Sequence, residues 1–381
     1  MIGLLEFYSA ERISGWARLP LEGADSTLSI FLDGKKVGEV KPDSSESGGS
    51  SGGRFSFALD LEVNPLTAVR VEVVTTGSGK HLQNSPVRTV FPSPESMAQV
   101  IVGKDDWLFL ANDSNRSHEQ MRGEAKLGSD FGDRWERFGH GLNEIESTGV
   151  RCFLMVVPNK ECIYRDEVSP FLDISQSRPL FEVEAALSRS WKGFGRRYRY
   201  PIHALTDARY SGAFPKGDTH WSTYGAWLAF RELFETDYPE EVKALELEIE
   251  RAGWADRMEH GDLVSKMGAL CVEPKKTAKI RGPKVRQTNG LNNSGSQIHA
   301  VDASVLHPRK ILFIRDSFGS ALMPFVGRAF GDVMLSWTGN VSKRLLDLYK
   351  PDVIFIERVE RFLVRPSEVV AEEVNDFAFI E

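Results

Sequence analysis

Four short runs of mostly apolar residues constrain the fold of this chain more than any other feature. They lie at residues 152–157, 311–314, 332–335 and 353–356, and polar residues, glycine or proline flank each of them. A strand that is apolar at nearly every position is buried on both faces, as in parallel sheets that are covered by helices. The four runs therefore predict one parallel sheet in an α/β fold.

Helical patterns separate these predicted strands. Between residues 135 and 145 apolar residues recur at steps of three and four, and Gly149 ends the pattern. This spacing places the apolar side chains on one face of a helix. Further helices are predicted over residues 180–191, over 223–235 and from just after Ser317, so that helices cover both faces of the sheet.

Residues 1–92 have a different pattern. Short alternating stretches at 28–32, 55–59 and 69–74 are typical of strands, and Asp33-Gly34 is a hairpin-turn signal. Pro92-Ser93-Pro94 then interrupts the chain. We therefore predict an all-β, sandwich-like N-terminal domain at residues 1–92 and an α/β domain at residues 93–381.

Charge and composition exclude several classes of protein. The net charge is -7, which makes non-specific binding to nucleic acid or anionic membranes a poor expectation. No apolar run approaches the roughly 20 residues of a membrane span. The N-terminus lacks the features of a signal peptide, so a cytoplasmic location is expected; a periplasmic location is the alternative if the sequence has been trimmed. Three cysteines, Cys152, Cys162 and Cys271, indicate reduced thiols without metal-site spacing.

Asp316 and Ser317 follow one of the buried strands directly. A serine at such a junction lies at the carboxyl edge of the sheet, where open α/β sheets bind ligands, and at a helix N-terminus that stabilises an oxyanion. The alternative is that Asp316 or Ser317 only caps the helix.

Asp218 and His220 form the second informative pair. A serine nucleophile needs a base within hydrogen-bond reach and an acid that orients the base. Asp218 and His220 can supply both from the loop before the helix at 223–235. The alternatives are an ordinary loop, with Ser222 as helix cap, or metal ligation, for which no second cluster of ligands is evident.

Together these motifs resemble a known family. An Asp-Thr-His-Trp run at 218–221 followed by Arg-Asp-Ser-Phe at 315–318 is similar to the SGNH-hydrolase-like O-acetyltransferases of the alginate acetylation type, the DHHW family. Supporting segments occur in the family's order at 103–109, 157–164, 261–263 and 351–361. The resemblance implies a flavodoxin-like SGNH-type sheet and a catalytic triad of Ser317, His220 and Asp218. The chain order differs from that of ordinary SGNH hydrolases, which place the serine first, but geometry and not order defines a triad.

The oxyanion-binding groups follow the family pattern less closely. Gly339 fits the glycine position after the third strand. Ordinary SGNH enzymes carry an asparagine after the fourth strand, where this chain has none, and Asn340 or Arg358 could substitute. Alternatively, the arginines of residues 357–361 pair with the glutamates of the same segment.

Other residues are weaker candidates for substrate binding. Lys160 and Tyr164 follow a strand end and could line the same crevice, or make ordinary loop contacts. Asp316 and Trp221 adjoin the proposed catalytic residues, and the alternative for Trp221 is a place in the core. We predict no metal ion and no bound cofactor, although the reaction requires an acyl donor.

The expected function is O-acyl transfer, most simply O-acetyl transfer, to a hydroxyl of a bacterial polysaccharide or glycan. A carbohydrate esterase with the same triad is the first alternative. The second is a non-catalytic glycan-binding protein, for which Phe7, Tyr8 and Trp16 of the β-domain could offer a stacking surface, although such aromatics are more often core. Expected partners are the glycan acceptor, the acyl donor and other polysaccharide-biosynthesis proteins, but not nucleic acid.

One basic segment has no assigned role. Six basic residues between 273 and 286 are opposed by Glu273 alone: Lys275, Lys276, Lys279, Arg281, Lys284 and Arg286. A solvated loop is the favoured interpretation, and a groove for an anionic sugar is the alternative.

Overall fold

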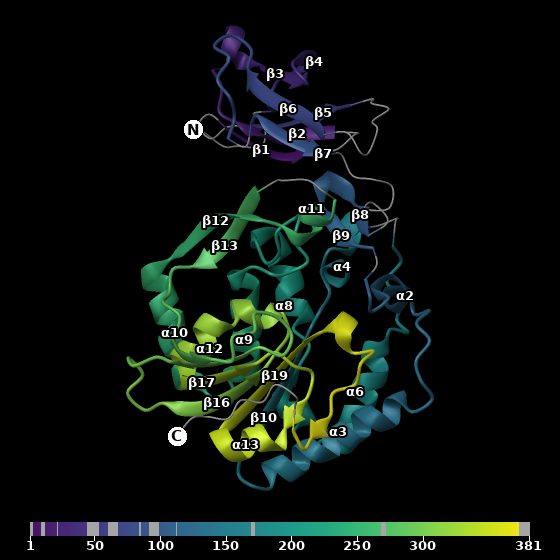
Figure 1. Ribbon diagram of the computed structural model, residues 1–381, viewed down its shortest axis with the longest axis vertical. Helices are drawn as coiled ribbons and strands as arrows, with labels where there is room; N and C mark the ends of the chain where they lie inside the picture. Colours follow the sequence, from purple (N-terminus) through teal and green to yellow (C-terminus); the bar gives the residue numbers. More distant parts are fainter. Residues whose placement is uncertain are drawn as a thin grey trace. The chain divides into compact units, whose positions relative to one another are not determined.

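The computed structural model describes most of the chain in two compact units (Figure 1). The described residues are 3–8, 12–20, 22–43, 53–59, 68–83, 85–90, 99–111, 113–168, 172–267 and 272–372. Unit 1 comprises residues 1–112, 215–219 and 257–274, and unit 2 comprises the rest. The predicted boundary at Pro92-Ser93-Pro94 and Cys271 lie outside the described residues. None of the described helices is long and apolar enough to cross a membrane.

Unit 1 is built mainly from two antiparallel sheets. One contains β1 (Gly3–Tyr8), β2 (Arg12–Ala17) and β5 (Gly53–Ala58); the other orders β4 (Lys35–Val40), β3 (Leu28–Leu32), β6 (Ala68–Thr75) and β7 (Val87–Val90). Asp33 and Gly34 join β3 to β4 with positive φ angles of 48° and 79°, as the hairpin signal predicts.

Both sheets of unit 1 contribute to one apolar core, which confirms the prediction of a sandwich-like β region. Leu5 and Ile13 come from the first sheet, and Ile30 and Val73 from the second. The unit also holds β8 (Val100–Val102), β9 (Leu108–Leu110) and helix α11 (Asp262–Lys266). Trp16 is half-buried, and the side chains of Phe7 and Tyr8 lie outside what the structure describes.

Unit 2 contains a seven-stranded sheet that positions the site. Its order is β11 (Tyr198–Arg199), β10 (Arg151–Val157), β19 (Val353–Val359), β16 (Arg309–Ile314), β17 (Gly331–Ser336), β15 (Gln297–Val301) and β14 (Lys284–Thr288). The strands from β11 to β17 are parallel, so all four predicted strands lie in one parallel sheet, as expected. The sequence did not predict β11, β14 or β15, and β15 runs antiparallel to both neighbours.

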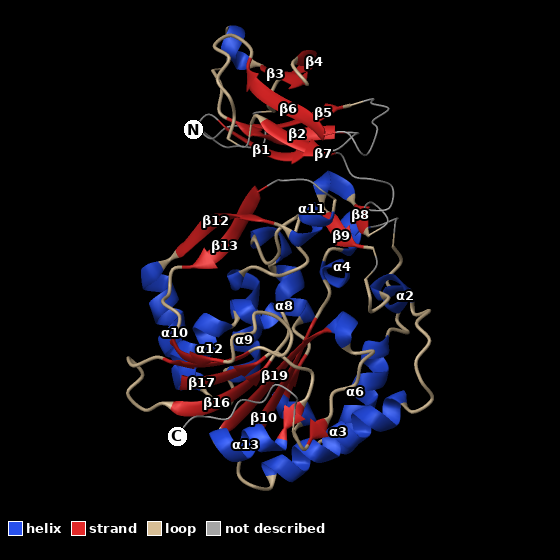
Figure 2. Ribbon diagram, viewed as in Figure 1, coloured by secondary structure: helices blue, strands red, loops and turns tan. Residues whose placement is uncertain are grey.

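Helices cover both faces of this sheet (Figure 2). Alternate residues of β10 point to opposite faces, because side chains alternate along a strand. Leu154 joins a core with α3 (Phe131–Glu146), α6 (Pro179–Ser190) and α13 (Lys343–Tyr349). Phe153 instead packs on Phe234 of α9 (Thr223–Phe234), with ring centroids 5.0 Å apart. Helix α12 (Met323–Phe330) covers the same side as α9. The predicted α/β fold class is therefore confirmed.

Apart from 3-10 turns, the remaining described helices are short except for α10, and the remaining described strands form two-stranded pairs. They are α2 (Ser117–Arg122), α4 (Lys160–Ile163), α5 (Arg165–Val168), α7 (Phe194–Arg197), α8 (Ile202–Asp207), α10 (Pro239–Ala252), β12 (Trp254–His260), β13 (Val272–Ala278), β18 (Val341–Ser342) and β20 (Val369–Val370).

Candidate active site

Ser317 lies in the turn after β16, at the carboxyl edge of the sheet. Asp316, only 2% exposed, fixes this turn. One carboxylate oxygen of Asp316 accepts a hydrogen bond from the Phe318 N–H (2.9 Å), and the other accepts one from the Val359 N–H of β19 (2.7 Å). The Ser317 hydroxyl makes no capping hydrogen bond to the described helix that follows. Asp316 therefore holds the turn, and the Ser317 hydroxyl is left for another partner.

That partner is His220. Its Nε2 lies 2.8 Å from the Oγ of Ser317, and its ring packs beside Phe318 with the centroids 4.8 Å apart. A distance of this size permits direct proton transfer from a hydroxyl to an imidazole. Ser317 and His220 are both partly exposed, so a small molecule can approach them. The structure thus brings a hydroxyl and an imidazole that are far apart in the sequence into the geometry that a nucleophile and its base require.

Two neighbours of His220 fix its place. The Trp221 side chain is fully buried, and its indole N–H donates to the carbonyl of Phe318 (2.9 Å). Ser222 caps α9 by accepting from the Gly225 N–H (3.1 Å), and its hydroxyl donates to the carbonyl of Gly212 (2.6 Å). Trp221 thereby links the loop that carries His220 to the turn that carries Ser317, and it has no exposed surface to offer a substrate.

Asp218 lies in a segment of unit 1 that hydrogen bonds anchor to the start of α11. Asp262 accepts hydrogen bonds from the Thr219 N–H and the Thr219 hydroxyl, both at 2.6 Å. A Cβ atom on Gly261 would lie 2.0 Å from the Gly217 carbonyl oxygen, so only glycine fits there. Asp218 itself is 6% exposed and precedes His220 by two residues. The sequence motif at 261–263 therefore has a physical role: it clamps the residues on either side of Asp218.

Comparison with known proteins identifies the family. Residues 100–297 match the family described as the SGNH hydrolase-like domain of the acetyltransferase AlgX. This range is more than half of the chain and includes Asp218 and His220, although it ends before Ser317. The chain belongs to this family. It is accordingly an SGNH-like O-acetyltransferase, and the resemblance inferred from the motifs is confirmed.

Several solved structures are similar to this acetyltransferase. PatB1 of Bacillus cereus with a sulfonyl adduct has a TM-score of 0.50 at 10% identity, over 70% of this chain and 97% of that chain. A DHHW family protein from Eubacterium siraeum has a TM-score of 0.48 at 12% identity, over 70% and 94%. The O-acetyltransferase domain of Pseudomonas putida AlgJ has a TM-score of 0.41 at 16% identity, over 74% and 95%. At these identities the likeness concerns the fold alone. No curated protein sequence matches the chain.

Gly339 and Arg358 of this acetyltransferase lie against each other. A Cβ atom at position 339 would lie 2.6 Å from an Nη atom of Arg358. The other Nη of Arg358 donates to the carbonyls of Phe362 (3.1 Å) and Arg365 (3.3 Å). Asn340 uses its side-chain oxygen to accept from the Glu368 N–H (3.1 Å). The oxyanion role predicted for these three residues remains a prediction.

The predicted pairing within residues 357–361 is not what the structure shows. Glu360 forms a salt bridge of 2.6 Å with Arg178, the residue that precedes α6, and both side chains are almost fully buried. Arg361 lies 3.6 Å from Asp113. Each partner is distant in the sequence, so the alternation of charges within residues 357–361 did not predict these ion pairs.

Lys160 and Tyr164 are buried rather than exposed in a crevice. Lys160 is 2% exposed. The hydroxyl of Tyr164 donates to the Arg209 carbonyl (2.6 Å) and accepts from the Phe214 N–H (3.3 Å), and burial raises the pKa of Tyr164. These contacts give both residues a place in the packing of the loop after β10.

Cys162 is equally unsuited to attack a substrate. It is 3% exposed, and burial followed by the negative charge of Glu360 raises the pKa of its thiol well above the usual value. The thiolate is the nucleophilic form of cysteine, so this residue is inert at neutral pH. Cys152 is likewise buried in β10 with a raised pKa.

Glu357 is a buried group of the site that the sequence did not reveal. It ends the apolar part of β19, is 0% exposed, and accepts a hydrogen bond from the Asp316 N–H (3.2 Å). Burial, together with the negative charge of Asp316, raises its pKa well above the usual value. A carboxyl group at the end of an otherwise apolar strand was the available signal. Glu357 therefore supports the Ser317 turn, and its raised pKa favours the neutral carboxylic acid.

This protonation state predicts how stability depends on pH. Above the unfolded pKa of Glu357, near 4.5, the folded protein binds one more proton than the unfolded chain, so the free energy of unfolding falls as pH rises toward the folded pKa. Glu357→Gln mimics the neutral acid and should remove this decline, by up to about 1.4 kcal/mol per pH unit. Urea midpoints followed by tryptophan fluorescence between pH 5 and 9 measure it. Glu250→Gln, on an exposed residue of α10, is the control, and equal slopes for Glu357→Gln and wild type would contradict the assignment.

Proposed function

We propose that this protein transfers an acetyl group to a hydroxyl of a polysaccharide through an acyl-enzyme on Ser317. The observation that supports this proposal most directly is the 2.8 Å contact between Ser317 Oγ and His220 Nε2 at the carboxyl edge of the sheet. Family membership supports the acetyl group and the class of acceptor. The acyl donor is an activated acetyl ester or thioester that the protein does not itself carry.

The proposed reaction has two halves. Ser317 Oγ attacks the acetyl carbonyl of the donor while His220 Nε2 takes the hydroxyl proton, and His220 then returns that proton to the departing group. In the second half, His220 takes a proton from the sugar hydroxyl, whose oxygen attacks the acetyl-serine. The acetyl–Ser317 bond breaks, and the proton returns to Ser317.

Transfer and hydrolysis differ only in the acceptor. Water that reaches the acetyl-serine would give an esterase, so the decisive experiment measures both products. Incubation with p-nitrophenyl acetate and an oligosaccharide, followed by mass spectrometry, should show acetylated sugar at the expense of free acetate. Release of free acetate at the same rate with and without sugar would favour the esterase.

We assign Asp218 the task of orienting His220 and stabilising its imidazolium form. Asp218→Asn should reduce kcat for acetyl transfer by about two to four orders of magnitude, because the base survives but is poorly oriented or in the wrong tautomer. Steady-state kinetics with p-nitrophenyl acetate measures this loss. Asp256→Asn, at an exposed position of β12, is a control for removing one negative charge, and wild-type kcat in Asp218→Asn would remove Asp218 from the triad.

A further inference from the structure

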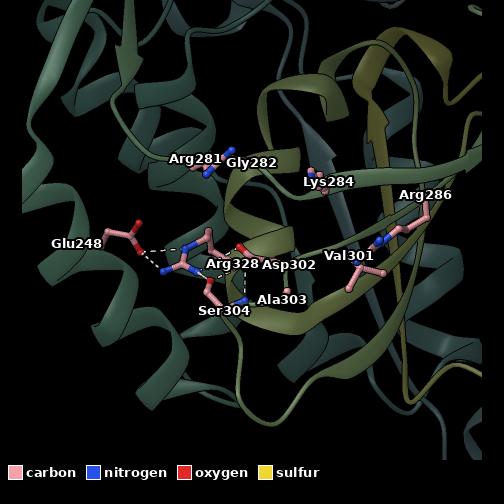
Figure 3. A pocket seen from close by; sticks show the side chains of 10 residues that line it. All are labelled: Glu248, Arg281, Gly282, Lys284, Arg286, Val301, Asp302, Ala303, Ser304 and Arg328. Atoms are coloured by element: carbon pink, nitrogen blue, oxygen red, sulfur yellow. Dashed lines mark hydrogen bonds and ion pairs between the residues drawn. The ribbon is translucent and has the colours of Figure 1, made fainter.

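A cavity of about 540 Å³ lies in unit 2 away from Ser317 (Figure 3). Its walls come from α10, α12, the start of β14 and the segment after β15. Most of its charged side chains are basic, and three of them belong to the basic segment that the sequence left without a role. The charged lining residues are Arg281, Lys284, Arg286, Arg328, Glu248 and Asp302.

The two acidic residues of the cavity are already paired. Glu248 and Asp302 both bind Arg328, at 2.7 Å and 3.1 Å (Figure 3). Arg281, Lys284 and Arg286 have no ion pair with any residue in the described part of the chain. Its charged lining of four basic and two acidic residues has a net charge of +2, and three exposed cations have no ion pair among the described residues, in a protein whose net charge is -7.

The backbone that carries these cations is firmly placed. Pro283 packs against α12 so closely that a Cβ atom at Gly327 would lie 2.5 Å from its ring. Just after the lining residues 302–304, Val305 and Pro308 pack similarly against Gly331, where a Cβ atom would lie 2.8 Å from Pro308. Arg286 is the extra residue of a β-bulge, because Val285 pairs with Ala300 and Gln287 with His299. Arg286 and Lys284 both line the cavity.

The cavity lies near the amino ends of the parallel strands, whereas Ser317 lies at their carboxyl ends. Lys284 pairs with Val301, which pairs with Asp332 near the start of β17, whereas Ser336 at the end of β17 pairs with Ile314, close to Ser317. The four residue steps from Asp332 to Ser336 span about 13 Å at about 3.3 Å per residue. A small ligand in the cavity therefore cannot be the molecule that reacts with Ser317, whereas a polymer is long enough to reach both.

We propose that this cavity is a second binding site for a carboxylate-bearing polysaccharide, which Arg281, Lys284 and Arg286 hold while a distant sugar of the same chain is acetylated. Guanidinium groups bind carboxylates through paired hydrogen bonds, and lysine adds a point charge. The acceptor class rests on the proposed function. The site gives long acceptors an affinity that short ones lack, because contact at one site raises the effective concentration at the other.

The test compares two double variants with the same change of charge. Lys284→Glu/Arg286→Glu alters the cavity, and Lys192→Glu/Lys279→Glu alters two exposed lysines outside it. Titration calorimetry with polygalacturonate should show binding that is about tenfold or more weaker for the cavity variant, weakens with salt, and is unchanged in the control. Digalacturonate should bind the wild type more weakly than polygalacturonate does, and neutral dextran should bind all three proteins equally weakly.

Two results would overturn the site: equal binding of polygalacturonate by the cavity variant and the wild type, or no binding by the wild type. Equal competition by a single-stranded oligonucleotide would overturn the glycan assignment, because it would indicate a general polyanion site. Hydrolysis of p-nitrophenyl acetate is measured in parallel and should be the same in all three proteins. Its absence from the wild type would count against the proposed function and leave the binding result standing.

Discussion

Ser317→Ala should lower acetyl transfer to a sugar and hydrolysis of p-nitrophenyl acetate by about four orders of magnitude or more. The Ser317 hydroxyl is the group that His220 Nε2 contacts at 2.8 Å, and alanine has no atom with which to form the acyl-enzyme. Folding should change little, since Asp316 and not Ser317 makes the hydrogen bonds that hold the turn. Steady-state kinetics, with circular dichroism to confirm folding, measures the effect.

Ser320→Ala is the matched control for this variant. Ser320 lies in the same turn, is exposed, and its hydroxyl contacts the guanidinium of Arg315 at 3.1 Å. It should keep wild-type turnover. Wild-type turnover in Ser317→Ala on both substrates would refute the serine mechanism.

His220→Ala should cost about as much as Ser317→Ala, and the double variant should lose little more than either single variant. The reason is that the two residues act as a unit: an unactivated serine and an imidazole without a nucleophile are both nearly inactive. The comparison requires kcat for all four proteins with the same ester. His203→Ala, on the exposed histidine of α8, is the control and should retain activity.

A double variant whose loss equals the product of the single losses would contradict this view. It would mean that Ser317 and His220 contribute independently, despite their hydrogen bond. Imidazole added to His220→Ala gives a second check, since a small base that fits the vacated space should restore part of the ester hydrolysis.

The sequence predicted best the parts of the fold whose residues are uniformly apolar. The strands β10, β16, β17 and β19 are buried on both faces, and continuous apolar runs identify such strands. The sequence did not reveal β14 (Lys-Val-Arg-Gln-Thr) or β15 (Gln-Ile-His-Ala-Val), because each strand contains both polar and apolar residues. These strands form by pairing with a neighbouring strand, and such pairing is not evident from the local sequence.

The same distinction applies to the candidate site: residues in local motifs could be predicted, and contacts between distant segments could not. The pairing of Ser317 with His220 could be predicted because both occur in short motifs whose chemistry is specific. The supports of these residues could not, because they depend on contacts between distant segments. Trp221 reaches the Phe318 carbonyl, Asp262 holds Thr219, and Glu357 lies beside the Asp316 backbone. Lys160 and Tyr164 stand at the expected end of β10, but sequence position alone did not show that they are buried.

The bulge in β14 has a consequence for solubility. β14 is the last strand of the described sheet, and a flat edge strand can recruit the edge of another molecule and start aggregation. An extra residue at Arg286, flanked by Lys284, interrupts the ladder and places positive charges along that edge. Exchange of Lys284 and Arg286 for valine would therefore do more than remove the proposed binding site. Together with Val285 it would place three consecutive valines on the exposed edge strand. Such a variant should precipitate during concentration under conditions in which the charge-reversed variant stays in solution.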